Sequence, residues 1–237
     1  MEPSVTGTLH ALGAMEHVVA VTRYCSRVVD IGDRPQLETT WSADAQAIAA
    51  LEPDLVIAAT PYRAGKIDEL LQAGLDVVCL YPRTLADIER HITLLGRITG
   101  TADAAASITA ALRAELAMAP VAAGQRVYVE MWPNPLRTAE TWVKEIVEAL
   151  GADFVPAEPN VQITGEQIID AAPDVIVLAW AGVAEIDPDP VYARPGWQQI
   201  PAVRDGRVLP VNEIMLNAPG PNLVEGIREL RQVLRGE

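Results

Sequence analysis

Short runs of apolar residues alternate with helical patterns along most of the chain. Residues 54–59 and 76–80 are each an aspartate followed by a continuous apolar run of strand length, and residues 66–73 between them place apolar side chains three and four positions apart. Strand–helix–strand order with continuously apolar strands is typical of a parallel sheet covered on both faces. The first third of the chain therefore predicts an α/β lobe, with one more buried strand expected at 18–21.

The middle of the chain has a different pattern. From residue 84 to residue 118 there is no strand signal, and apolar residues keep helical spacing with one interruption at Gly100 and Thr101. Thr101 is suited to cap a second helical segment. A single helix of about 35 residues would span on the order of 50 Å, more than one small lobe. We therefore expect a rigid helix that joins two lobes.

Alternation resumes after this helix. The strands expected after residue 120 are 126–131, 174–179 and 206–211. The helices expected there are 141–150, 165–171 and 222–235. The predicted fold class is α/β, with two Rossmann-like lobes containing parallel sheets and joined by a long backbone helix. The predicted domains are an N-terminal α/β lobe at 1–82, the backbone helix at 83–119 and a C-terminal α/β lobe at 120–237.

One stretch of sequence occurs twice. Residues 47–57 and 167–177 both have a helical pattern, then Pro-Asp, then an apolar strand. Proline ends a helix and cannot donate to a strand ladder, so it suits the entrance of a strand. Such connectors are common in α/β proteins, so each copy alone is weak. One copy on each side of the predicted helix favours two similar lobes.

Composition narrows the classes of function. The 237 residues are 50% hydrophobic and carry 32 acidic against 18 basic side chains, a net charge of −14, which argues against a nucleic-acid-binding surface. No apolar run reaches the roughly 18 residues of a membrane span. Cys25 and Cys79 stand apart from any Cys-x-x-Cys pair, so we expect two buried or half-buried thiols, with a disulfide left open.

Motifs for catalysis and for metal binding are missing from the sequence. It contains no Gly-x-Ser-x-Gly elbow, no P-loop and no Gly-x-Gly-x-x-Gly, so we predict that the chain is not an enzyme. His10, His17 and His91 lack the spacing of metal ligands, so neither a metal site nor a cofactor is expected.

Aromatic residues gather where strands are predicted to end. Ligands of open α/β lobes sit at the carboxyl ends of the strands. The aromatic residues that follow a predicted strand are Tyr24, Tyr62, Tyr81, Trp132 and Trp180. Their faces suit a large, flat, partly apolar ligand. The alternative is that they are ordinary, partly buried core residues.

Charged residues lie at the same predicted strand ends. Arg63 and Arg137 are suited to a ligand carboxylate, phosphate or amide, or are solvated surface charges. Glu130 follows a buried strand, where it either faces a cleft or caps a helix.

Motifs spread over nearly the whole chain resemble those of a known family. They are PSVTGTLHALG at 3–13, VAVTRYC at 19–25, ALEPDLVI at 50–57, the stretches 193–197 and 202–208, and NAPGP at 217–221. In this order they resemble the helical-backbone solute-binding proteins of ABC importers, in the cobalamin and iron-chelate group. The resemblance implies cobalamin or a related corrinoid as the ligand, bound in a cleft between the lobes. Alternatives are a ferric-siderophore or haem binding protein of the same fold, or an intracellular corrinoid-handling protein.

The resemblance and the predicted strand ends together give the expected site and partners. The expected ligand-binding residues are Ser4, Tyr24, Trp41, Tyr62, Trp132, Arg137, Trp180, Met215 and Asn217. The resemblance implies a monomer that works with an ABC permease dimer in the membrane, in a periplasmic or lipid-anchored location. The first five residues show no signal peptide, which leaves a cytoplasmic location open.

Overall fold

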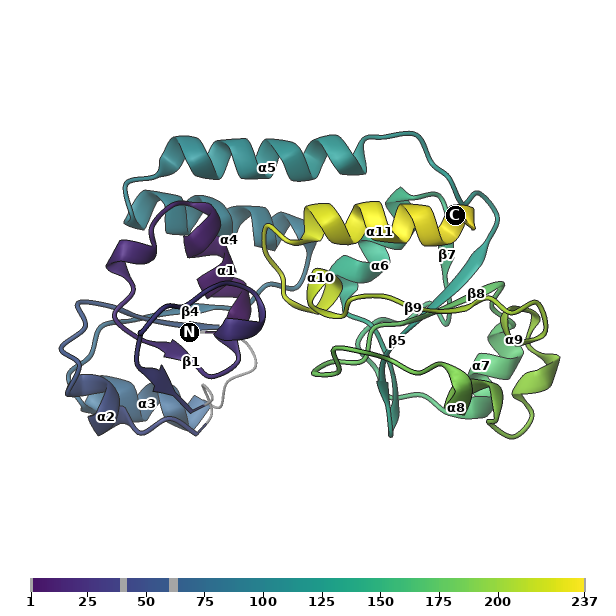
Figure 1. Cartoon of the computed structure of the whole chain (residues 1–237), viewed down its shortest axis with the longest axis horizontal. Coiled ribbons are helices and arrows are strands. Elements are labelled where there is room, and N and C mark those ends of the chain that lie inside the picture. The colour runs from purple at the N-terminus through teal and green to yellow at the C-terminus, as the bar shows by residue number, and fades with distance from the viewer. Residues whose placement is uncertain (1, 39–41, 60–63, 237) are drawn as a thin grey trace. The chain divides into compact units, whose positions relative to one another are not determined.

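The computed structural model describes residues 2–38, 42–59 and 64–236. The chain divides into two compact units, which are described separately here (Figure 1). Unit 1 comprises Met1–Pro82, Ala86–Ala110 and Pro219–Pro221, and unit 2 comprises Arg83–Leu85, Ala111–Ala218 and Asn222–Glu237.

Unit 1 contains short helices and two parallel pairs of strands. In chain order its elements are α1 (Pro3–Ala11), η1 (Met15–His17), β1 (Val21–Thr22), η2 (Cys25–Arg27), β2 (Gln36–Leu37), α2 (Ala45–Ala49), β3 (Val56–Ala59), α3 (Ala64–Gln72), β4 (Val77–Leu80), α4 (Leu85–Ile98) and the first part of α5 (Ala102–Leu116). β1 pairs with β2, and β3 pairs with β4. Ile48, Val56 and Leu70 form a core between α2, β3 and α3.

The strand predicted at 18–21 is wrong for most of its length. β1 begins only at Val21, and Val18 instead caps the 3-10 helix η1. The carbonyl oxygen of Val18 accepts a hydrogen bond from Nε of Arg34 at 3.0 Å. The carbonyl oxygen of Met15 accepts one from Nη2 of Arg34 at 2.7 Å. These backbone acceptors are satisfied by a side chain, so the segment needs no neighbouring strand.

Helix α1 was not predicted from the apolar pattern. Pro3 is at its first position, where a missing N–H costs nothing. Thr6 and Thr8 are buried in it, and Thr8 Oγ1 donates to the carbonyl oxygen of Ser4 at 2.7 Å. Polar residues on the buried face hide the helical periodicity in the sequence.

The single helix predicted over 84–118 is two helices. α4 ends at Ile98 and α5 begins at Ala102, with Gly100 between them at a left-handed φ of 72°. A Cβ on Gly96 of α4 would lie 2.5 Å from Cβ of Ala105 in α5, so α5 turns back along α4 (Figure 1). The boundary between the units falls within α5, after Ala110.

Unit 2 is built on one mixed sheet. Its elements are β5 (Arg126–Pro133), β6 (Leu136–Thr138), α6 (Thr141–Ala149), β7 (Asp153–Phe154), α7 (Gly165–Ala171), β8 (Val175–Leu178), α8 (Asp189–Tyr192), η3 (Trp197–Gln199), α9 (Pro201–Arg204), β9 (Val208–Pro210), α10 (Ile214–Asn217) and α11 (Leu223–Arg235). The order is β6-β5-β8-β9, with β7 also on β5. β5, β7, β8 and β9 run parallel, whereas β6 is antiparallel to β5.

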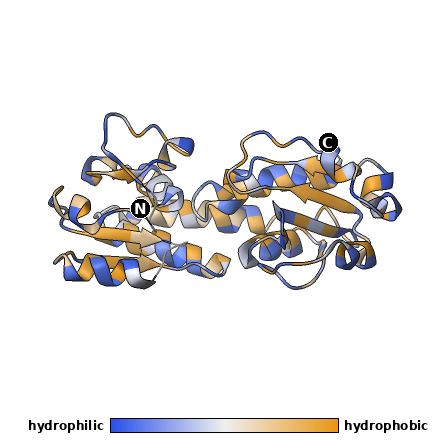
Figure 2. Cartoon of the chain, turned by 90° about the horizontal axis from the view of Figure 1, so that it is seen from below, coloured by the Kyte–Doolittle hydropathy of each residue, from blue (hydrophilic) through white to orange (hydrophobic). Residues whose placement is uncertain are grey.

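Hydropathy follows this arrangement. β3 and β8 are buried along their whole lengths, and the strands of each unit are largely hydrophobic whereas the helices are mixed (Figure 2). Continuously apolar strands under helices are the pattern expected of parallel sheets. No helix in the described part of the chain is long and apolar enough to cross a membrane.

The repeated sequence forms the same structure twice. α2 leads into β3, and α7 leads into β8. In both copies the residue before the proline has a left-handed backbone, with φ of 48° at Glu52 and 44° at Ala172. The two stretches are therefore alike in backbone conformation as well as in sequence.

Replacing Gly226 with alanine should destabilise unit 2. A Cβ at this position of α11 would lie 2.2 Å from the carbonyl oxygen of Met215 in α10, so one helix must shift. We expect a loss of about 1–3 kcal/mol in the free energy of unfolding, typical of overpacking. Gly65→Ala in α3 is the control, because its Cβ meets nothing within 4 Å. Equal urea midpoints for Gly226→Ala and the parent would contradict this packing.

The ion pair between Arg126 and Asp174 should make stability depend on pH. Arg126 donates to the carboxylate from its backbone N–H at 2.9 Å and from Nε and Nη2 at 3.2 and 3.1 Å. The side-chain hydrogen bond is the main reason that the pKa of Asp174 is lowered. The ionised carboxylate therefore stabilises the fold above the unfolded pKa of about 3.9, and this contribution is lost as the pH falls through the lower folded pKa.

Asp174→Asn should accordingly lower the unfolding free energy at pH 7 by no more than about 1 kcal/mol, since the pair is partly exposed. The difference from the parent should shrink in urea unfolding below about pH 4. Asp205→Asn, which removes an exposed pair with the adjacent Arg204, is the control. A difference for Asp174→Asn that stays constant from pH 7 to pH 3 would contradict the assignment.

Candidate functional site

The carboxyl ends of β5 and β8 lie side by side in unit 2. The backbone N–H of Ala179 donates to the carbonyl of Glu130 at 3.0 Å, and that of Ala181 donates to the carbonyl of Met131 at 3.0 Å. Trp180, between these two residues, is therefore held at the end of β5. This is the edge of a parallel sheet at which ligands of α/β proteins bind.

Glu130 is completely buried and is paired at this edge. Its Oε1 accepts hydrogen bonds from Nε1 of Trp180 at 2.8 Å and Nη2 of Arg194 at 2.7 Å, and its Oε2 accepts one from Nη1 of Arg194 at 2.6 Å. The guanidinium carbon of Arg194 also lies 4.4 Å from the ring centroid of Trp197. Glu130 caps no helix among the described residues, so that interpretation from the sequence is wrong, whereas a position facing a cleft stays a prediction. A buried carboxylate requires such partners.

The burial of this pair affects a neighbouring phenol. Tyr128 precedes Glu130 by two positions in β5 and therefore lies on the same face of the strand. The pKa of Tyr128 is raised well above its usual value, mainly by burial and then by the negative charge of Glu130. The phenol therefore stays neutral over the physiological pH range.

Trp132 and Arg137 are brought together across a hairpin. They are opposite each other in the β5–β6 pairing, and the preceding pair is Glu130 with Thr138. Met131 lies between Glu130 and Trp132 without a partner in β6, which makes a β-bulge in β5. Opposed residues of antiparallel strands share one face. Trp132 is 43% exposed, with its Nε1 donating to the carbonyl of Asn134 at 2.9 Å. The hairpin therefore presents an aromatic ring whose polar atom is already satisfied.

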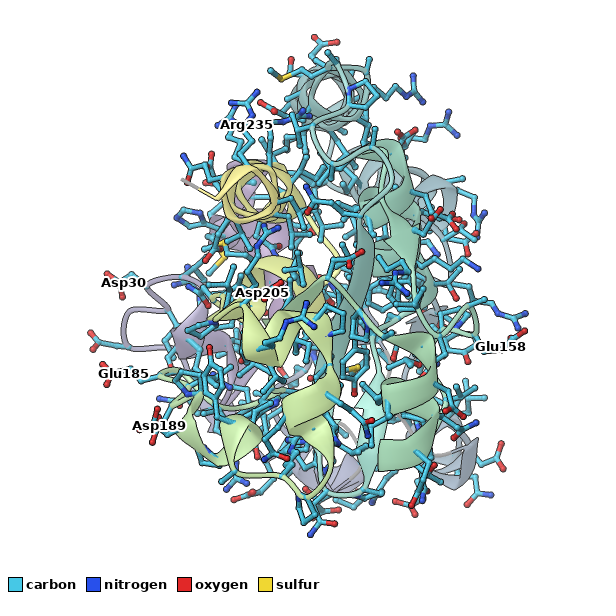
Figure 3. All side chains as sticks on the ribbon, turned by 90° about the vertical axis from the view of Figure 1, so that its right-hand side faces the viewer. Asp30, Glu158, Glu185, Asp189, Asp205 and Arg235 are labelled. Atoms are coloured by element: carbon cyan, nitrogen blue, oxygen red, sulfur yellow. The ribbon has the colours of Figure 1, made fainter. Side chains whose placement is uncertain are left out.

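Arg137 is held by a neighbouring loop. Its Nη2 donates to the carbonyl oxygen of Asn160 at 2.9 Å, and its Nε donates to Oδ1 of the same residue at 3.2 Å. The side chain is half-buried, so it is not a freely moving surface charge. Other charged residues of the unit, including Glu158, Glu185 and Asp189, extend away from the ribbon (Figure 3).

Helix α10 brings Asn217 and Met215 to the end of β8. Nδ2 of Asn217 donates to the carbonyl oxygen of Ala179 at 2.7 Å, directly before Trp180. Oδ1 of Asn217 is buried and has no hydrogen-bond partner among the described residues. Met215 is half-buried in the same short helix. Asn217 therefore lies beside Trp180, and Met215 is two positions before Asn217 in the same helix.

Tyr24 and Ser4 lie in unit 1. Tyr24 follows β1, is half-buried, and its hydroxyl accepts a hydrogen bond from Nη2 of Arg23 at 2.9 Å. The Arg23 guanidinium carbon also lies 4.9 Å from the Tyr24 ring centroid. Ser4 is half-buried in α1, which contacts η2 through a hydrogen bond of 3.1 Å from Thr6 Oγ1 to Sγ of Cys25. Trp41 and Tyr62 fall outside the described residues.

Both cysteines and three small cavities lie in the described part of unit 1. Both cysteines are free; Cys25 is buried as expected, whereas Cys79 is exposed, so that part of the expectation is wrong. Three cavities in unit 1 have volumes of about 30, 20 and 60 Å³, enough for water and too small for a large ligand. No group of three or more potential metal-ligating side chains occurs within the described ranges.

Sequence reasoning missed the pairing that orders this site. Glu130 was visible as a charge at the end of an apolar strand, but nothing in the sequence pointed to Arg194 as its partner, because they are 64 positions apart. The link between Trp180 and Glu130 likewise spans 50 positions. Contacts of this separation are set by sheet topology.

The sequence is similar to solute-binding proteins over nearly its whole length. A family model described as periplasmic binding protein matches residues 1–213. A substrate-binding lipoprotein of an ABC transporter from Bacillus subtilis, itself uncharacterized, is 26% identical over 97% of this chain and 77% of its own length. A cobalamin-binding protein of Halobacterium salinarum is 28% identical, over 95% of this chain and 65% of that protein. A vitamin B12-binding protein of Vibrio parahaemolyticus is 24% identical, over 97% and 86%.

Solved structures show the same fold. A periplasmic heme-binding protein from Roseiflexus sp. RS-1 in apo form superposes with a TM-score of 0.85 at 21% identity, covering 99% of this chain and 96% of that one. The periplasmic vitamin B12-binding protein of Vibrio cholerae superposes with a TM-score of 0.81 at 20% identity, covering 99% and 94%. These similarities confirm the predicted α/β fold with parallel sheets. The chain belongs to the periplasmic binding protein family, and it is the substrate-binding component of an ABC importer and not an enzyme.

Proposed function

We propose that the chain binds cobalamin or a related corrinoid at the rim formed by Trp132, Arg137, Trp180, Met215 and Asn217. The observation that carries the proposal is the pair of tryptophans, Trp132 and Trp180, at the carboxyl ends of adjacent strands in one sheet. Relatives named as cobalamin-binding and vitamin B12-binding proteins support a corrinoid as the ligand.

The rim suits a flat and partly apolar ligand for a physical reason. The indole N–H of Trp132 is satisfied by Asn134 and that of Trp180 by Glu130, so neither ring needs water at its polar atom. An aromatic face then offers apolar contact at a small cost in side-chain entropy. Arg137, on the same face as Trp132, offers donors to the polar groups around such a ligand.

Haem is a second candidate, favoured by one contact in unit 1. Tyr24 follows β1, and Arg23 donates a hydrogen bond to its hydroxyl. A guanidinium at this position stabilises the negative charge that a phenolate carries when it is an iron ligand.

The proposal extends to the partner and the location. We propose that the chain, as a monomer outside the cytoplasm, delivers its ligand to a dimeric ABC permease. Names of relatives as a lipoprotein and as periplasmic proteins support this location. Family membership supports a permease partner.

Trp132→Ala and Trp180→Ala should each weaken corrinoid binding. Loss of a buried aromatic anchor costs at least about 2 kcal/mol, or near thirtyfold in affinity. The measurement is calorimetric titration with aquocobalamin, cobinamide, haem and a ferric siderophore. Leu71→Ala is the control, because this side chain is exposed near the end of α3 in unit 1 and is not one of the proposed rim residues.

Two results would count against the proposal in different ways. If both tryptophan variants bind corrinoid as tightly as the parent, the rim assignment is wrong. If the parent binds none of the four ligands, the ligand class is wrong, although family membership stands.

Tyr24→Phe separates the two candidate ligands. The substitution removes only the hydroxyl oxygen, so binding through an iron–oxygen bond should be lost whereas stacking should persist. If haem is the ligand, its visible absorption bands should shift and its affinity should fall at least about tenfold, since a metal-ligand bond is lost. Unchanged haem spectra and affinity in Tyr24→Phe would exclude Tyr24 as an iron ligand.

A further inference from the structure

We infer that Glu130 and Arg194 are positioning residues, which fix the side chain of Trp180 for ligand binding without touching the ligand. This inference rests on the proposed function, because it assigns a role to residues beneath the same rim. It adds that the affinity for the ligand depends on the buried ion pair between Glu130 and Arg194.

The first reason is the cost of placing charge here. Glu130 is next to Val129 in β5 and is paired with Leu178 of β8, and neither of these two residues has any solvent exposure. Two apolar side chains of similar volume in place of a buried ion pair are often as stabilising or more so. Stability alone therefore does not account for an ion pair at this position, and conformational specificity is the remaining role.

The second reason is that the pair leaves Trp180 one orientation. Trp180 is half-buried, and its Nε1 donates to Glu130 Oε1 while the backbone on either side of it is bonded to β5. One point on the ring and one on the backbone are thus both fixed, which restricts both side-chain torsions. The ring edge that carries Nε1 is directed to the buried carboxylate, and the half-buried ring also packs against the hydrophobic core of unit 2.

The third reason is that the carboxylate is itself held from two sides. Arg194 forms a two-pronged contact with both carboxylate oxygens, which fixes the plane of the carboxyl group. The guanidinium is in turn stacked on Trp197, which is 2% exposed. The acceptor of the Trp180 hydrogen bond is thus fixed by two further packed side chains, Arg194 and Trp197.

The test is a double-mutant cycle with Glu130→Gln and Trp180→Ala. The glutamine keeps the size of the side chain, but its amide NH₂ replaces one carboxylate oxygen and faces a guanidinium that also only donates. One of the two hydrogen bonds from Arg194 is therefore lost, together with the negative charge. Corrinoid affinity should fall about tenfold in Glu130→Gln, comparable to the loss of a charged hydrogen bond. In the double variant it should fall no further than in Trp180→Ala alone, because Glu130 acts through Trp180.

A matched control comes from the same two strands. Asp174→Asn also breaks an ion pair of an arginine with a carboxylate, but at the opposite ends of β5 and β8. Corrinoid affinity in this variant should change less than twofold. A readout without ligand is acrylamide quenching of tryptophan fluorescence, which should be stronger in Glu130→Gln than in the parent and unchanged in Asp174→Asn. The increase should be absent when Glu130→Gln/Trp180→Phe is compared with Trp180→Phe, because Trp180 is the ring that becomes more accessible.

The outcomes separate the inference from the proposed function. If Trp180→Ala loses affinity and Glu130→Gln does not, positioning is wrong and the proposed function stands. If Trp180→Ala binds as tightly as the parent, the proposed role of Trp180 is wrong and the inference falls with it. If Glu130→Gln does not fold, Arg194→Lys replaces it. This variant keeps the charge but loses the two-pronged contact, so affinity should again fall, and unchanged affinity would overturn the inference.

Discussion

Unit 2 depends on one constraint, which is that a carboxylate without solvent exposure must be paired. Glu130 is in β5, and its two oxygens accept hydrogen bonds from Arg194 and Trp180. These partners come from segments that follow β8 and α8, so satisfying one charge brings three distant parts of the chain to the same sheet edge. The rim exists in its present form because the cost of that buried charge is met there.

A binding protein needs a surface that holds a ligand without reacting with it, and the rim of unit 2 has this character. Its aromatic rings have their indole N–H groups occupied by protein acceptors. Arg137 is restrained by Asn160, and Asn217 is bonded to the backbone beside Trp180. The exposed groups are thus mainly apolar faces and guanidinium donors, which favour contact and orientation. Membership in the periplasmic binding protein family agrees with this chemistry.

Backbone conformation explains where the sequence pattern misled. Apolar spacing resumes after the interruption at Gly100 and Thr101, and so indicated one long helix, yet a left-handed φ at Gly100 ends α4. The missing side chain of Gly96 then lets Ala105 approach, and α5 folds back. In α1 the buried positions include Thr6 and Thr8, whose polarity concealed the helix. Each error arises at a residue whose role is to let two helices come close, or to form a hydrogen bond inside the fold, and such residues do not add to the apolar pattern.

The sequence by itself determined the α/β class, most strands and helices, the repeated helix-Pro-Asp-strand unit and the family. These depend on local periodicity and short motifs, which neighbouring residues set. It also placed Tyr24, Trp132 and Trp180 at strand ends, since that requires only the strand boundaries. Only the tertiary structure decided that Arg194 pairs with Glu130 and that Trp132 is opposite Arg137. Those contacts depend on strand order, on an extra residue in β5 and on burial, and these are properties of the assembled sheet.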